Sequence, residues 1–137
     1  MPITRTTRSE HNLTIVTHTG EISDNEFINF YWRFFQGEVF KKPMKLLIDL
    51  READSRSRSS GTLHEFAGFV NEGLNENSTF PRVAVVAPKS LSYGLARMYQ
   101  SYSESVPWEF IIFRAIDAAL AWLEVPEDLD ISKGEET

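Results

Sequence analysis

The chain of 137 residues contains no cysteine. Disulfide bonds, thiolate metal sites and cysteine nucleophiles are therefore excluded. It also contains no run of about 18 apolar residues, so the sequence predicts no transmembrane helix. The first residues, MPITRTTRSE, lack the apolar stretch of a signal peptide. From these absences we expect a cytoplasmic protein.

Positive charge is scarce as well. The net charge is −6 at pH 7, and the segment from Glu124 to Thr137 holds six acids and one lysine, which leaves the rest of the chain nearly neutral. Neither part has the basic surface that nucleic-acid binding needs, so we expect no nucleic-acid partner. We predict one domain over residues 1–124 and an acidic, flexible tail over residues 125–137.

The sequence also lacks the motifs of common enzyme classes. His11, His18 and His64 are the only histidines, and they do not have the spacing of metal ligands. No nucleophile elbow, Walker loop or glycine-rich dinucleotide turn is present. Ser60 and His64 could be drawn as a nucleophile and its base, but a spacing of four is easily accidental. We therefore expect no catalytic residue, no metal and no cofactor.

What remains is the pattern of a single α/β domain. Hydrophobic residues make up 42% of the chain, which is ordinary for a globular domain of this length. Segments 3–8 and 13–18 are rich in threonine and β-branched residues and predict an N-terminal hairpin. Three apolar segments without polar alternation predict strands that are buried on both faces: Lys45–Leu50, Arg82–Ala87 and Glu109–Phe113.

Helical patterns separate these strands. The first helix should start at Ser23, where Ser23 and Glu26 have capping-box spacing, and should run to about Phe40 before Pro43 stops it. Apolar spacing predicts three more helices over residues 62–74, 91–102 and 117–123, the second of them with Leu91, Leu95, Met98 and Tyr102 on one face. Helices between strands imply right-handed crossovers and a mostly parallel sheet, with the hairpin as an antiparallel edge.

The first helix is unusually aromatic, with six aromatic residues among the nine from Phe27 to Phe35. At about 100° per residue, its apolar side chains sweep roughly 200°, whereas a helix on a sheet needs a stripe a little over 100° wide. The surplus could face a neighbouring helix, a second copy in a homodimer, or a pocket for an apolar ligand. The candidate interface residues are Phe27, Tyr31, Trp32 and Phe35.

Serine and arginine alternate between the first buried strand and the next helix, in LIDLREADSRSRSSGTL. Loops at the carboxyl ends of parallel strands are the usual ligand positions in α/β sheets, and a helix N-terminus can bind an anion. Arg51, Arg56 and Arg58 are therefore candidate anion-binding residues. A plain turn is the competing interpretation, in which the helix is capped by a box over residues 62–65 or by a serine just before it.

The order and spacing of three stretches resemble the STAS fold of anti-sigma-factor antagonists, and in particular the SpoIIAA-like (STAS/SEC14) family of small bacterial proteins. The resemblance covers roughly residues 10–123. The first stretch is Leu47–Leu50 leading to Ser59–Leu63. The second is Arg82–Val86 followed by Gly94–Tyr99, and the third is Phe113-Arg114 followed by Ala118–Leu123.

In phosphoregulated STAS proteins a partner kinase modifies a serine in an Asp-Ser-Ser-Gly stretch. The resemblance therefore implies that Ser60 and Ser59 are candidate phosphoacceptors, although Arg58 stands in the place of the aspartate and the loop is one residue longer. It implies a non-enzymatic regulatory or protein-interaction module with a protein partner or a second copy of itself. Lipid transfer by SEC14-type domains suggests the alternative, a carrier or sensor of a small apolar or anionic ligand.

Overall fold

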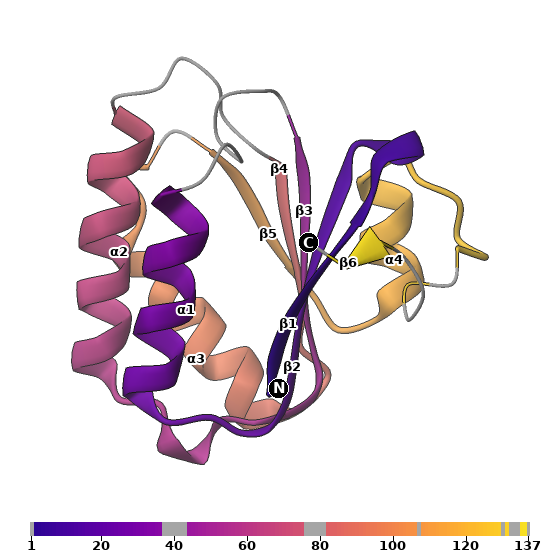
Figure 1. Cartoon of the computed structure of the whole chain (residues 1–137). Helices are drawn as coiled ribbons and strands as arrows, with labels where there is room; N and C mark the ends of the chain where they lie inside the picture. Colours follow the sequence, from indigo (N-terminus) through magenta and orange to yellow (C-terminus); the bar gives the residue numbers. More distant parts are fainter. Residues whose placement is uncertain are drawn as a thin grey trace.

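The computed structural model describes residues 2–36, 44–75, 82–106, 108–129, 131 and 135–136. One twisted sheet carries three helices on one face and one helix on the other (Figure 1). The strands are β1 (Ile3–Arg8), β2 (Leu13–Glu21), β3 (Lys45–Asp54), β4 (Arg82–Val86), β5 (Glu109–Phe113) and β6 (Glu135–Glu136). The helices are α1 (Asp24–Gln36), α2 (Ser60–Asn75), α3 (Ser90–Tyr102) and α4 (Ile116–Trp122).

The strand order is β5-β4-β3-β2-β1-β6. β1 and β2 form the predicted antiparallel hairpin. β2, β3, β4 and β5 then run parallel to one another, so the three apolar segments are adjacent parallel strands as predicted. β6 adds two residues antiparallel to β1 at the far edge. The α/β fold with a mostly parallel sheet and an N-terminal hairpin is therefore confirmed.

Two cores lie on opposite faces of the sheet, because successive residues of a strand point to opposite sides. On β3, Leu46 and Ile48 belong to the core beneath α1, α2 and α3, whereas Leu47 belongs to the core beneath α4. This double burial explains why the apolar segments show no polar alternation. β5 differs from our prediction that it is buried on both faces, because it lies at one edge of the sheet and Ile111 on it is 40% exposed.

β3 is longer than predicted, since it continues past Leu50 to Asp54. Its last residues pair with the end of β2 after a shift of register between Thr17 and Thr19. Such irregularities bend a strand and re-aim a side chain. Here the shift surrounds His18, which is buried against the rings of Phe27 and Tyr31.

The start of α1 agrees with its predicted capping signal, whereas the buried face of α3 differs from the prediction. At the start of α1, the Glu26 amide donates to Oγ of Ser23 over 3.1 Å and the Ser23 amide donates to Oε1 of Glu26 over 3.4 Å, which confirms the predicted capping box. The predicted end of this helix near Phe40 lies outside the described residues. α3 buries Ser92, Ala96 and Tyr99 instead of the predicted apolar face, because the small side chains let the helix approach and the Tyr99 ring stacks on Phe66 at 4.9 Å.

The start of the acidic tail contributes to the core beneath α4. Val125 is 6% exposed, and Leu129 and Ile131 pack against the same cluster. The domain boundary and the flexibility of the tail stay predictions. In the segments that the structure describes, no helix has both the length and the apolar character needed to cross a membrane.

Candidate functional site

The serine–arginine stretch lies at the carboxyl end of β3, where a short 3-10 turn (Ser55–Ser57) leads into α2. Two of its three candidate anion-binding arginines pair with carboxylates close by in the chain. Arg51 makes two hydrogen bonds of 3.0 Å to the carboxylate of Asp49. The guanidinium of Arg56 lies 2.6 Å from the carboxylate of Asp54, and its hydrogen bonds hold the pKa of Asp54 below 3.8.

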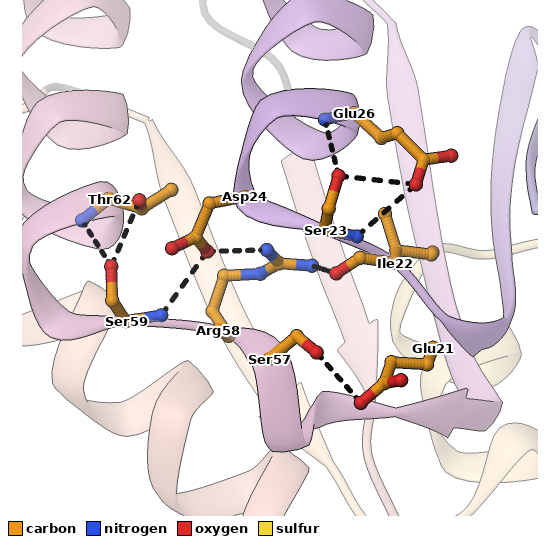
Figure 2. A network of polar contacts seen from close by, with 9 residues as sticks. All are labelled: Glu21, Ile22, Ser23, Asp24, Glu26, Ser57, Arg58, Ser59 and Thr62. Atoms are coloured by element: carbon orange, nitrogen blue, oxygen red, sulfur yellow. Dashed lines mark hydrogen bonds and ion pairs between the residues drawn. The ribbon is translucent and has the colours of Figure 1, made fainter.

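Arg58 is directed toward the start of α1 (Figure 2). Its side chain is 8% exposed and donates to Oδ1 of Asp24 over 2.8 Å and to the carbonyl of Ile22 over 3.1 Å. The guanidinium carbon also lies 4.1 Å from the centre of the Phe27 ring. These contacts with a carboxylate, a carbonyl and an aromatic ring therefore hold the Arg58 guanidinium inside the domain. Each of the three arginines pairs with a different carboxylate, and anion binding by them stays a prediction.

Asp24, the first residue of α1, accepts hydrogen bonds from two residues of the loop. Its Oδ1 accepts from Arg58 and, over 3.2 Å, from the backbone amide of Ser59 (Figure 2). Burial would raise the pKa of Asp24, but hydrogen bonds from Ser59, Arg58 and Thr62 outweigh that effect and keep the pKa below 3.8. The carboxylate is therefore charged at neutral pH and ties the start of α2 to the start of α1.

Ser59 is the N-cap of α2. Its Oγ accepts from the Thr62 amide over 3.1 Å and donates to Oγ1 of Thr62 over 3.0 Å. This geometry decides between the capping alternatives in favour of a serine before the helix, and against a cap by Thr62. As a candidate phosphoacceptor, Ser59 is therefore a hydroxyl already engaged in two hydrogen bonds.

The other serines of the loop divide into two that are engaged and one that is not. Ser55 is bonded to Ser92 of α3 over 2.7 Å, and Ser57 donates to Glu21 at the end of β2 over 2.7 Å. Ser60, in the first turn of α2, is exposed, and its hydroxyl has no hydrogen-bond partner in the part of the chain that the structure describes. Most of this serine–arginine pattern therefore fastens the loop to three neighbouring elements, and Ser60 alone leaves its hydroxyl free for a reaction.

A small cavity lies between the sheet and the three helices on that face. Its volume is about 80 Å³, and its lining is mainly aromatic and aliphatic. His18 lines it, with Nε2 2.8 Å from the hydroxyl of Tyr31. Burial, assisted by the positive charge of Arg58 and opposed by Asp49, lowers the pKa of His18 from 6.5 to about 3. The imidazole is therefore neutral at physiological pH.

The candidate interface residues of α1 separate into two groups. Phe27 and Tyr31 are 6% and 1% exposed, and their rings pack on Phe66 of α2. A partner chain could not reach them, which corrects the prediction for these two residues. Trp32 is 52% exposed and remains a candidate, whereas the side chain of Phe35 lies outside the described residues.

The buried position of His18 has a signal in the sequence that the prediction of its site missed. In LTIVTHTG the alternation of a strand places His18 on the same face as Val16, which belongs to the core beneath α1, α2 and α3. No comparable local signal joins Arg58 to Asp24, because the two residues are 34 apart in the chain. Among the described residues, no three His, Asp or Glu side chains come together as a metal site would require.

Comparisons with known proteins agree with this architecture. The model of the SpoIIAA-like family matches residues 13–124. A solved structure of an uncharacterized protein of the DUF3478 family with a SpoIIAA-like fold, from Shewanella loihica PV-4, is similar with a TM-score of 0.57. The two are 20% identical, and the alignment covers 88% of this chain and 91% of the other, so the likeness is one of fold. No curated protein matches the chain.

Proposed function

The chain belongs to the SpoIIAA-like family, and from that membership and the loop geometry we propose that it is a non-enzymatic regulatory module whose protein partner reads the state of Ser60. The observation that carries the proposal is the exposed, uncommitted hydroxyl of Ser60 beside loop serines that are all hydrogen-bonded. A modifying enzyme could reach it without opening the fold. The proposal goes beyond family membership, which supports only a domain of the STAS type.

A phosphate on Ser60 would stay at the surface. It would sit in the first turn of α2, where free amide groups and the helix dipole favour negative charge. Arg58 would not be released to bind it, because Asp24 and the Ile22 carbonyl already hold that guanidinium. Phosphorylation would therefore add about −1.5 to −2 charges to the surface and leave the fold intact. A partner would detect the charge directly.

The surroundings of Ser60 support a regulatory role over a catalytic one. The ring of His64, the one histidine within a helical turn, lies against the Tyr102 ring at 5.0 Å. Both Ser60 and His64 are exposed, and no described residue orients the imidazole toward the serine by a hydrogen bond. A nucleophile of the serine type needs a base within hydrogen-bond reach and a third group that orients that base.

Binding measurements can test this proposal. Wild-type protein, Ser60→Asp and Ser60→Ala would be immobilised, and proteins captured from the native host would be quantified. We expect at least one captured protein to change several-fold with Ser60→Asp relative to Ser60→Ala. Ser101→Asp is the matched control, since it adds the same charge at an exposed serine of α3. Equal capture by all variants would contradict a partner that reads Ser60.

Self-association through α1 is a further part of this proposal. Among the described side chains of α1, Trp32 is the large apolar one that is exposed, and its ring meets Phe69 of α2 at 5.8 Å. An aromatic side chain that spans two helices suits the centre of an interface with a second copy, since tryptophan is enriched in such positions.

A second candidate function, a sensor or carrier of a small ligand, is favoured by the cavity that His18 lines. The cavity lies on the face of the sheet covered by α1, α2 and α3. Its volume of about 80 Å³ is only that of two or three water molecules in the liquid. It could therefore not hold the acyl chain of a lipid without movement of the helices.

A further inference from the structure

The chemistry of the cavity points to a particular class of ligand. We propose that it binds a small neutral molecule with a flat apolar body and one hydrogen-bonding group, anchored by Nδ1 of His18. The proposal rests on the small-ligand alternative above and is independent of Ser60. Three features of the described residues carry it: an unused polar atom, aromatic walls and a polar rim.

The unused polar atom belongs to His18. The residue is 4% exposed, and its Nε2 is engaged by the Tyr31 hydroxyl. Within the described residues Nδ1 has no hydrogen-bond partner. Because His18 lines the cavity, a guest can supply the missing bond. The neutral ring offers either a donor or an acceptor at Nδ1, so a guest group that can both donate and accept suits either tautomer.

The walls are built from aromatic rings that brace one another. Phe27 meets Phe66 edge-on at 5.2 Å, and Phe66 stacks on Tyr99 at 4.9 Å. Trp108 and Phe110 continue this lining, stacked on each other at 5.4 Å. Flat rings pair with such walls by offset or edge-on contact. The limited volume restricts the guest to about the size of one small ring.

The rim explains why the guest should be neutral. Asp54, Ser55, Arg58 and Ser92 line the cavity from the end of β3, the loop and the first turn of α3, which is the usual ligand edge of a parallel sheet. The Arg58 guanidinium is committed to Asp24 and Ile22, so its charge repels cations without offering a free fork to an anion.

Pyrazole is a suitable probe, because it is a flat, neutral ring with one donor and one acceptor. Furan is the matched control, a flat five-membered ring of similar size without a strong hydrogen-bonding group. Each would be titrated into the full chain while NMR follows the His18 ring nitrogens and the Trp108 indole. We expect saturable shifts with pyrazole at concentrations on the order of 1 mM, as befits so few atoms. Binding of furan should be roughly three- to tenfold weaker.

Variants locate the anchor. His18→Phe keeps a flat ring and removes the nitrogens, so pyrazole binding should fall by the same factor, whereas His64→Phe at the exposed histidine of α2 should change nothing. If His18→Phe does not fold, the comparison of the two probes on the wild type still shows whether a hydrogen-bonding group strengthens binding. Equal binding of both probes would overturn the proposed ligand class and leave a general apolar site. Binding of neither would remove the small-ligand alternative as well, and neither result touches the proposal for Ser60.

Discussion

Mild acid should destabilise this domain because of a single buried side chain. His18 has a pKa of about 3 in the folded state, against 6.5 for an ordinary histidine. Between these two pKa values His18 is therefore protonated in the unfolded chain and neutral in the folded chain. The stability that the neutral ring contributes is complete above pH 6.5 and is lost as the pH falls toward 3. Each pH unit in this window costs about 1.4 kcal/mol, so acidification from pH 7 to pH 5 should remove about 2 kcal/mol.

Urea denaturation at pH 7, 6 and 5, monitored by tryptophan fluorescence, measures this loss directly. His18→Gln has no titrating ring, so its stability should fall by about 2 kcal/mol less than that of the wild type over the same range. The carboxyl groups of Asp24 and Asp54 have pKa values below 3.8 and add their own losses only at lower pH. The exposed His64, changed to Gln, is the control. Parallel losses in wild type and His18→Gln would refute a buried, neutral His18.

Three other predictions concern the loop and the aromatic helix. Ser59→Ala should cost about 1 kcal/mol in urea denaturation because it removes the cap of α2, whereas Ser60→Ala should stay within about 0.5 kcal/mol; equal effects would refute their different roles. Arg58→Met should cost roughly 2 kcal/mol, since it breaks a largely buried ion pair, and Arg56→Met, at an exposed pair, should cost clearly less; the reverse order would contradict the buried position of Arg58 in the network of Figure 2. Trp32→Glu should weaken self-association by a few kcal/mol in sedimentation equilibrium, and a wild type that is monomeric at about 100 µM would reject the dimer, since interfaces of this kind bind more tightly.

The fold could be predicted because its signals are local. Unbroken apolar segments such as Lys45–Leu50 belong to strands covered on both faces, and Ser23 with Glu26 marks a helix start by spacing alone. Signals of this kind need no knowledge of what packs where. The edge position of β5 was not visible in this way, because Glu109–Phe113 is as apolar as the central strands and only the sheet order exposes Ile111.

The candidate site could be predicted only in position. The sequence placed Ser59 and Ser60 at the start of a helix, and the structure agrees, but which of them is the cap depends on the exact first turn. The sequence showed that Arg58 replaces the aspartate of the related pattern. It could not show that Asp24 brings a carboxylate from α1 to the same loop, because the pairing of charges distant in sequence follows from tertiary packing.

The most direct test of the central claim is the phosphorylation state of Ser60 in protein isolated from its native host. Trypsin should release the fragment from Ser59 to Arg82, in which fragment ions distinguish the two adjacent serines. The account predicts a phosphate on Ser60, its loss in Ser60→Ala and its retention in Ser59→Ala. Repeated recovery of this fragment without modification under varied growth conditions, or with the phosphate on Ser59 alone, would contradict the role of Ser60 as the residue that a partner reads.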